Sequence, residues 1–285
     1  MSKQEILASI KASEGRVLIS EVIGTVQPLL YNISNAELAA AFGADLLLLN
    51  MFDPEHPVFH GLPETAPTEI IREIKRLTGR LIGVNLEPVD EATSNLPLGR
   101  RASVSIARQV REMGADLIVL TGNPGTAVSK AGILNAISSI SQELGADLII
   151  AAGKMHAAGV WRESGEGIIT PEDVLAFAAA GCDLILMPAP GTVPGLTLEY
   201  VRSLVKLAHD RGVLVITTIG TSQEGADAET IRQLALQCKM AGADLHHLGD
   251  AGYPGIAVPE NIMTYSIAIR GRRHTYSRMA RSINR

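Results

Sequence analysis

The stretch GADLLLLN, residues 43–50, returns along the chain with small changes and decides the fold. Four further copies read GADLIVLT (114–121), GADLIIAA (145–152), GCDLILMP (181–188) and GADLHHLG (242–249). The glycine suits the left-handed residue that follows a helix, and the apolar run suits a strand that is buried on both faces. Each copy therefore predicts a junction at which a helix ends and a parallel strand begins.

Three further segments, GRVLISEV (15–22), GRLIGVNLE (79–87) and RGVLVITTIG (211–220), complete a set of eight. The predicted strands cover 17–22, 45–50, 81–87, 116–121, 147–152, 183–188, 213–218 and 244–248. Helical segments separate them, such as the one that Ser34 and Glu37 start with a capping box and the one that begins at Thr170 and Pro171.

Eight strands that alternate with helices predict an α/β fold, a single (β/α)₈ TIM barrel over residues 1–270. A helix within residues 1–14 is expected to close the lower end of the barrel, and residues 271–285 form a basic C-terminal tail. An open doubly wound sheet is the alternative. It would show a glycine fingerprint after its first strand, and EVIGTVQP (21–28) is no such fingerprint.

The composition excludes several classes of protein. Of 285 residues, 46% are hydrophobic and 19% are charged, which supports a large core rather than disorder. A net charge of −5 argues against general nucleic-acid binding. No apolar run approaches the roughly 18 residues of a membrane span, and two cysteines make no disulfide framework. We expect a cytoplasmic protein that forms a homo-oligomer.

The charge is unevenly distributed. Six arginines and no acidic residue lie among the last 25 residues. Because opposite charges attract, we expect this basic segment to dock on an acidic surface of its own barrel or of a neighbouring subunit. Contact with RNA or a membrane is the alternative.

The active sites of such barrels lie at the carboxyl ends of the strands. Polar residues there yield the candidate catalytic set of Lys154, Glu87, Glu21, His156 and Asn85. If residues 147–156 stay extended, Lys154 and His156 point the same way as Leu148, Ile150 and Ala152. The alternatives are that Glu21 and Glu87 are solvated acids at the rim and that Lys154 pairs with one of them. In GADLHHLG, one histidine must face the barrel interior and the other must face the helices.

Two loops near the C-terminus suggest an anion site. Barrels often bind phosphate between the loops that follow the last two strands, through backbone N–H groups. These loops are rich in glycine, and their candidate phosphate-binding residues are Gly220, Thr221, Ser222, Gly249, Asp250 and Gly252. Tight turns without a ligand would explain the same glycines.

A divalent metal, Mg²⁺, Mn²⁺ or Zn²⁺, is a further possibility. Its proposed ligands are Asp53 and His247, which Glu21, Glu87 and His156 would complement. No compact ligand motif supports it, and no organic cofactor is indicated. A connection of about 17 residues, which includes GKMHAAGVWRESGEG (153–167), carries the only tryptophan, Trp161, and is predicted to be a lid over the site.

The stretch IGVNLEPVDEATSNLPLGRRASVSIARQVREMGADLIVLTGNPGTA (82–127) resembles the BtpA/SgcQ family of barrel proteins. The resemblance rests on a GVN strand end, a helix of small residues and a following AD strand. It implies a phosphate-barrel-like fold and Asn85 as a site residue, and it links the chain to photosystem I assembly or sugar-utilisation functions. The sequence departs from that family at LEPVDEA and in the arginine-rich tail.

Three functions follow from these observations. The first is a lyase or isomerase that acts on a small phosphorylated or carboxylated metabolite, with Lys154 as electrophile, Schiff-base amine or anion clamp. The second is a metal-dependent hydrolase that uses the same carboxylates and histidines. The third is a non-catalytic BtpA-like assembly or regulatory factor.

Overall fold

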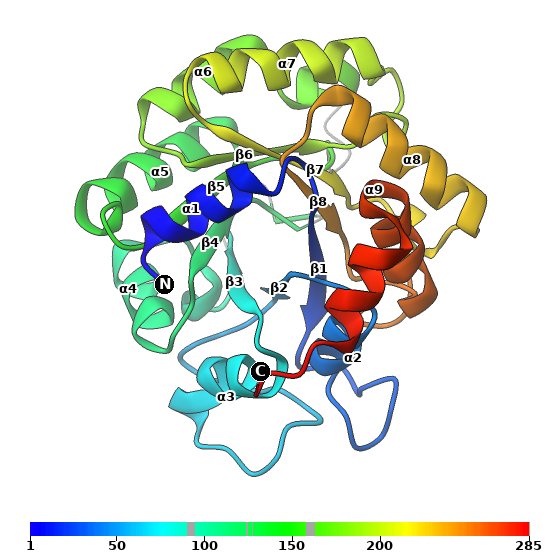
Figure 1. Ribbon diagram of the computed structural model, residues 1–285. Coiled ribbons are helices and arrows are strands. Elements are labelled where there is room, and N and C mark those ends of the chain that lie inside the picture. Colours follow the sequence, from blue (N-terminus) through cyan, green and yellow to red (C-terminus); the bar gives the residue numbers. More distant parts are fainter. Residues whose placement is uncertain (90–94, 124, 127, 158–162, 285) are drawn as a thin grey trace.

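The computed structural model describes residues 1–89, 95–123, 125–126, 128–157 and 163–284. Eight parallel strands form a closed barrel in the order β1 to β8 (Figure 1). They are β1 Val17–Ile23, β2 Leu46–Asn50, β3 Leu81–Leu86, β4 Leu117–Leu120, β5 Ile149–Gly153, β6 Leu184–Pro188, β7 Leu214–Ile219 and β8 Leu245–Leu248. The predicted (β/α)₈ barrel is confirmed, and each strand begins within two residues of its predicted start.

Helices surround the barrel wall. They are α2 Asn35–Ala41, α3 Ile70–Thr78, α4 Val104–Glu112, α5 Lys130–Leu144, α6 Pro171–Ala179, α7 Leu198–Asp210, α8 Ala228–Ala241 and α9 Pro259–Ala280. The predicted capping boxes at Ser34 and Thr170 are both present. Helix α1, Lys3–Ala12, crosses the end of the barrel at which the strands begin, which we call the barrel foot (Figure 1). It packs Ile6 and Ile10 against the apolar side chains of the interior.

Alternation along the strands separates two cores. Side chains such as Ile19, Leu48 and Val119 fill the barrel interior, whereas their neighbours, such as Leu18, Leu47 and Ile118, pack against the helices. Because side chains alternate between the two faces of a strand, Glu21 and Asn50 continue the interior rows. The interior rows are therefore apolar at the foot of the barrel and polar at the carboxyl ends of the strands.

The aspartates of the repeat hold neighbouring strands together at the barrel foot. In four of the five copies, the aspartate carboxylate accepts a hydrogen bond from a backbone N–H of the preceding strand at 2.8 Å. The pairs are Asp45 with Leu18, Asp116 with Ile82, Asp183 with Ile150 and Asp244 with Val215. The aspartate N–H returns a hydrogen bond to the carbonyl oxygen of the same partner. We call this two-way contact the aspartate clasp.

A basic side chain contacts the aspartate carboxylate of each clasp. The ion pairs are Asp45 with Arg270 and Arg278, Asp116 with Lys75, Asp183 with Lys3, and Asp244 with His209, whose charge depends on protonation. The fifth aspartate, Asp147, is exposed, pairs with Arg111 on the surface and bonds to no strand. Four copies of the repeat therefore form a clasp, whereas the copy with Asp147 shares their sequence but not this contact.

The basic C-terminal segment folds back on the barrel foot. Helix α9 breaks at Gly271, whose φ of 74° and ψ of 166° are not helical. The residues beyond this break carry Arg278 to Asp45, where Arg270 from before the break also binds. The predicted docking of this segment on an acidic group of its own barrel is confirmed. Within the described ranges, no helix combines the length and the hydropathy that crossing a membrane would require.

Candidate functional site

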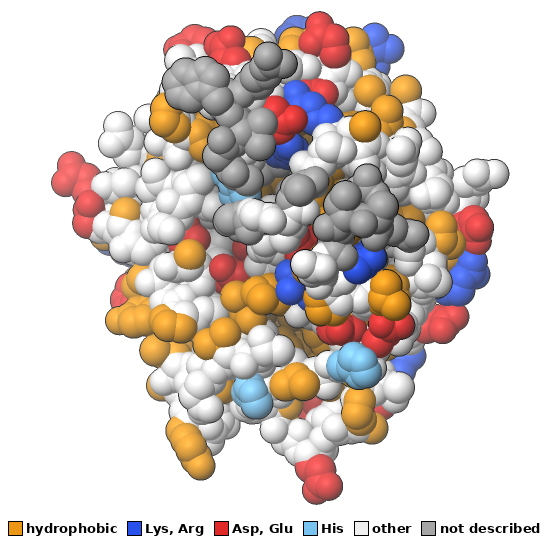
Figure 2. All heavy atoms as spheres, turned by 180° about the vertical axis from the view of Figure 1, so that it is seen from behind, with side chains coloured by type: hydrophobic (Ala, Val, Ile, Leu, Met, Phe, Trp, Pro, Cys, Tyr) orange, Lys and Arg blue, Asp and Glu red, His pale blue; other side chains and the backbone are white. Residues whose placement is uncertain are grey.

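The carboxyl ends of the strands bring a set of polar side chains into the barrel mouth, and acidic groups are visible in the middle of this face in Figure 2. Seven of them, from six of the strands or directly after them, are at most 5% exposed: Glu21, Asn50, Asn85, Glu87, Thr121, Thr218 and His247. Removing polar groups from water is costly unless they find partners. Their contacts therefore show how the site is organised.

Three asparagines form the centre of one half of the mouth. The amides of Asn50 and Asn123 bond to each other in both directions, at 3.1 and 3.2 Å, and Asn85 Nδ2 donates to Asn50 Oδ1 at 3.1 Å. Asn123 then donates twice to Glu87, from its backbone N–H at 3.1 Å and from Nδ2 at 3.0 Å. Asn85 near the end of β3 and Glu87 just beyond it are thus joined through Asn50 and Asn123. The amide oxygen of Asn85 is buried and has no partner among the described residues.

Arg100 supplies a positive charge to Glu87. The chain returns to β3 after a loop, where the N–H of Glu87 donates to the Arg100 carbonyl and the N–H of Ala102 donates to the Glu87 carbonyl, both at 2.9 Å. This pairing places the Arg100 guanidinium in an ion pair with the Glu87 carboxylate. An ionised carboxylate is the form that a guanidinium and two N–H donors favour. Glu87 is therefore a buried, charged acceptor and not a solvated acid at the rim.

Glu21 and His247 occupy the other half of the mouth. Burial raises the pKa of Glu21 well above its ordinary value, and the negative charges of Asp250 and Glu224 raise it further. Burial also lowers the pKa of His247 to about 3. The Glu21 Oε2 and His247 Nε2 atoms are 3.6 Å apart, but these directions favour a protonated acid beside a neutral imidazole and not an ion pair. His247 Nδ1 lies 3.0 Å from Thr218 Oγ1, with donor and acceptor set by the tautomer.

Asp250 connects the two halves. Its Oδ2 atom accepts a hydrogen bond from Asn50 Nδ2 at 2.8 Å, and its charge acts on both Glu21 and Glu224. Burial raises the pKa of Asp250 and of Glu224. Among the described residues, the mouth therefore contains four carboxyl groups. Three of them have raised pKa values, and Glu87 has a guanidinium partner.

The two histidines of GADLHHLG divide as predicted. His247 faces the barrel interior. His246 faces the helices, where its ring nitrogens lie 3.0 Å from the Tyr265 hydroxyl and 3.0 Å from the Gly15 carbonyl oxygen. Burial lowers the pKa of His246 to about 4. His246 is thus a core histidine with both nitrogens satisfied.

Lys154 and His156 do not continue a barrel strand. Strand β5 ends at Gly153, with Ile149 and Ala151 in the barrel interior. Leu148, Ile150 and Ala152, whose direction Lys154 and His156 were expected to share, pack against the helices. Lys154 instead forms an ion pair with Glu163 across the long connection that follows β5. A salt bridge for Lys154 was expected, but with Glu21 or Glu87 as its partner.

His156 lies close enough to Lys154 for the lysine charge to matter. Its pKa is lowered by burial and then by this charge. Its Nδ1 atom is buried without a partner among the described residues. Trp161, the centre of the predicted lid, lies outside the described residues, so the lid remains a prediction.

The predicted phosphate loops are closely packed. The Gly249 N–H is already bonded to the Ile219 carbonyl at 2.8 Å, and a Cβ atom at Gly249 would lie 2.7 Å from Glu224 Oε1. Thr221 bonds to Thr192 and Gln223, and Ser222 starts a short 3₁₀ helix in the left-handed conformation. A Cβ at Gly220 would contact Met155, and one at Gly252 would contact the Val258 N–H. Glycine at these positions lets the loops pack closely against each other. Tight turns without a ligand would account for them equally well.

The predicted metal ligands are not brought together. Asp53 Oδ1 accepts hydrogen bonds from the backbone N–H groups of Glu55 and His56 and so stabilises a turn. His247 instead contacts Thr218 and Glu21. Among the described residues, no group of three or more His, Cys, Asp or Glu side chains is arranged to hold a metal ion.

Two site residues were missed by reasoning from the sequence. Glu224 lies in the loop after β7 and is 1% exposed, and its Oε1 atom accepts a hydrogen bond from the Ala251 N–H at 3.1 Å. Its place after a strand was a usable signal. Arg100 comes 14 residues after the end of β3, and only the return of the loop brings it to the mouth. No local signal marks it.

Comparison with solved structures supports the fold alone, because all identities are low. The chain is 16% identical to thiamine phosphate pyrophosphorylase from Pyrococcus furiosus, with a TM-score of 0.50 and coverage of 90% of this chain and 97% of that one. It is 14% identical to a putative fructose-1,6-biphosphate aldolase from Coccidioides immitis, with a TM-score of 0.52 and coverage of 97% and 92%.

A third similar structure is the carboxyl transferase domain of Rhizobium etli pyruvate carboxylase, at 13% identity and a TM-score of 0.53, with coverage of 97% of this chain and 50% of that one. A comparison with curated proteins found no match. One family model matches residues 1–285, the basic C-terminal segment included. The chain belongs to the family described as Domain of unknown function (DUF7916).

Proposed function

We propose that the protein is a lyase or isomerase that moves protons on a small metabolite at the barrel mouth. The observation that supports it is the contrast between two buried carboxyl groups. Glu21 has a raised pKa and is suited to donate a proton, whereas Glu87 is held in its charged form by Arg100 and Asn123. A carboxyl group that stays protonated can donate a proton, while an ion-paired carboxylate in the same site can accept one.

The substrate that fits this mouth is small and polar. Four buried atoms have no hydrogen-bond partner among the described residues: Glu21 Oε1, Asn85 Oδ1, Thr121 Oγ1 and His247 Nε2. Hydroxyl or carbonyl groups of a metabolite would provide such partners. A single phosphate or carboxylate group would reach Lys154 by competing with Glu163. Additional anionic groups would meet the four carboxyl groups of the mouth, so a substrate with one such group suits it best.

Solvent deuterium exchange tests the proposal without knowledge of the product. The protein is incubated in D₂O with three-carbon sugar phosphates and with small 2-oxo acids, and the C–H groups next to the carbonyl are followed by NMR. Exchange is expected for at least one compound. Glu87→Gln and Glu21→Gln should each slow it by about 10²-fold or more, while the exposed Glu143→Gln should leave it unchanged. Exchange that survives both site variants would rule out these two roles.

A Schiff base at Lys154 is a separate part of this proposal. Borohydride treatment in the presence of an exchanging carbonyl compound would reduce it to a stable adduct. A mass increase on the peptide that contains Lys154, absent in Lys154→Ala, is the expected result. Exchange without any adduct would leave Lys154 as an anion clamp.

Two other functions have less support from the geometry. A metal-dependent hydrolase would need Asp53 and His247 to converge, whereas Asp53 bonds to its own turn and His247 to Thr218. A BtpA-like assembly factor would use the arginine segment for docking, but Arg270 and Arg278 are already bound to Asp45. If no compound exchanges and if phosphate, phosphoenolpyruvate and divalent ions all leave the melting temperature unchanged, the assembly role becomes the better explanation.

A further inference from the structure

A large cavity lies at the foot of the barrel, opposite the mouth. It has a volume of about 1320 Å³ and lies between helix α1, the first residues of β1 to β3 and the end of α9. The apolar interior of the barrel and the side chains of Ile6 and Ile10 separate it from the polar mouth. A molecule in this cavity therefore cannot reach Glu21 or Glu87.

The lining of this cavity is strongly basic. Six of its side chains are Arg or Lys and two are Asp: Arg16, Lys75, Arg80, Arg270, Arg278 and Arg281 against Asp45 and Asp116. Asp45 is shared by Arg270 and Arg278, and Asp116 is bound to Lys75. The two acids are thus already used, and positive charge remains in excess.

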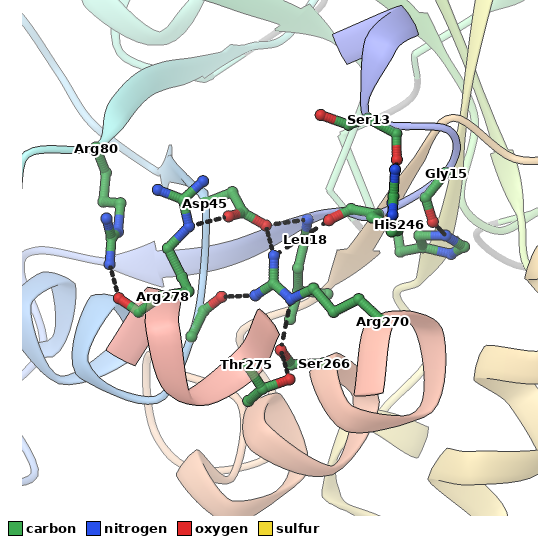
Figure 3. A network of polar contacts seen from close by, with 12 residues as sticks. Ser13, Gly15, Leu18, Asp45, Arg80, His246, Ser266, Arg270, Thr275 and Arg278 are labelled. Atoms are coloured by element: carbon green, nitrogen blue, oxygen red, sulfur yellow. Dashed lines mark hydrogen bonds and ion pairs between the residues drawn. The ribbon is translucent and has the colours of Figure 1, made fainter. Parts of the chain in front are cut away.

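Arg80 is the clearest sign of that excess. It is 8% exposed, and its Nη2 atom donates to the Arg278 carbonyl at 3.0 Å (Figure 3). The same atom donates to the Ala40 carbonyl at 3.4 Å. Its Nε atom has no partner, and it forms no ion pair with the described residues. Burial and then the charge of Arg278 lower the pKa of Arg80 to about 10, although the negative charge of Asp45 acts in the opposite direction. A buried guanidinium that forms no ion pair is costly, and an anion in the cavity would reduce that cost.

We propose that this cavity is a binding site for a small polyanion with two or more phosphate or carboxylate groups. Arg80 and Arg281 would bind it through their guanidinium forks, the geometry that suits both kinds of group. The cavity exceeds the 300–1,000 Å³ of ordinary ligand sites, so a metabolite of moderate size has room. Because its walls come from α1, β3 and the end of α9, a bound polyanion fixes the C-terminal segment to the barrel foot.

Calorimetric titration of the full chain with inorganic pyrophosphate and, separately, with citrate tests the proposal and distinguishes phosphate from carboxylate ligands. Saturable binding to one site is expected for at least one probe, and it should weaken as salt is added. Arg281→Gln and Arg80→Gln should each weaken it roughly tenfold. Arg273→Gln is the matched control, because Arg273 belongs to the same segment, is exposed and does not line the cavity.

Hydrogen exchange then locates the bound probe. Protection is expected at the foot of β3 and in the C-terminal part of α9. Protection in the loops after β7 and β8, or an affinity that neither arginine variant changes, would overturn the proposal and favour an anion site at the mouth. Absence of binding by both probes would also overturn it. Arg281 is exposed, so its variant decides the outcome even if Arg80→Gln fails to fold.

Discussion

Asn50 and Asp250 join across 200 residues of chain by a hydrogen bond of 2.8 Å. Asn50 ends β2 and Asp250 follows β8, and these two strands flank β1, which carries Glu21. The bond therefore closes the barrel mouth around Glu21 and holds a second carboxylate near it. This placement explains why Glu21 is both buried and influenced by the charge of Asp250.

Removal of Arg100 should expose the energetic role of its pair with Glu87. Arg100→Gln leaves a buried carboxylate with hydrogen bonds but no counter-charge, and we expect a loss of about 3 kcal/mol in the free energy of unfolding. The double variant with Glu87→Gln should lose less than the sum of the two single losses. Urea denaturation of the four proteins measures this coupling. The exposed pair Arg108 and Glu143 is the control, with a coupling below about 1 kcal/mol; equal couplings would contradict the burial argument.

Glu21 should make stability depend on pH above its ordinary pKa of 4.5. Its pKa in the folded protein lies well above the ordinary 4.5, so its contribution to stability is complete below that value and is lost as pH rises toward the folded pKa. Glu21→Gln removes this loss. The variant should therefore become more stable relative to the parent protein as the pH is raised from about 4.5. Denaturation at a series of pH values measures the difference, and a constant difference would count against a raised pKa.

His247 should act in the opposite direction at acidic pH. Its pKa falls from 6.5 to about 3 in the folded protein, so its contribution is present above pH 6.5 and is lost as pH falls toward 3. His247→Asn removes one protonation that favours unfolding, and its stability curve should fall less steeply between these values. His246 remains in the variant and titrates in the same direction, with a folded pKa of about 4. Identical slopes for variant and parent would contradict this assignment.

An aspartate that forms a clasp should contribute far more to the free energy of unfolding than Asp147, which occupies the same position of the repeat without forming one. Asp45→Ala leaves the buried Arg270 and the Leu18 N–H without their acceptor, and we expect a loss of about 3 to 5 kcal/mol. Asp147→Ala changes the aspartate at the same position of another copy of the repeat. Because Asp147 is exposed and bonds to Arg111 instead of a strand, the expected loss is below about 0.5 kcal/mol. Thermal or urea denaturation compares the two variants. Equal losses of stability would contradict a special contribution of the clasp.

The fold followed from the sequence because the repeated junction carries both of its determinants, the end of a helix and the start of a buried strand. Candidates on strands, such as Glu21, Asn85 and His247, could be placed because alternation fixes the direction of a side chain once the strand is known. Lys154 could not be placed in this way, since β5 ends one residue before it. Arg100 depends on how a loop returns to β3, and such a contact leaves no periodic trace in the sequence.

For the basic C-terminal segment, the amino-acid composition predicted that it would dock, but not which side chains the docking would enclose. Its excess of arginine predicted docking on an acidic group, and Asp45 is that group. The composition alone did not reveal that docking would leave Arg80 enclosed without an acid partner among the described residues. That arrangement depends on the relative positions of α1, β3 and α9.

The four clasps also have a consequence for how the barrel can be divided. Each one holds an odd-numbered strand to the even-numbered strand that follows it, and no clasp joins an even strand to the next odd strand. The wall therefore consists of four two-stranded modules, each with its own fastening. Cutting the chain between modules, for instance in the connection between β4 and β5, leaves every fastening intact. Fragments made in this way are the ones suited to reassemble from separate chains, whereas a cut between β3 and β4 separates Asp116 from Ile82.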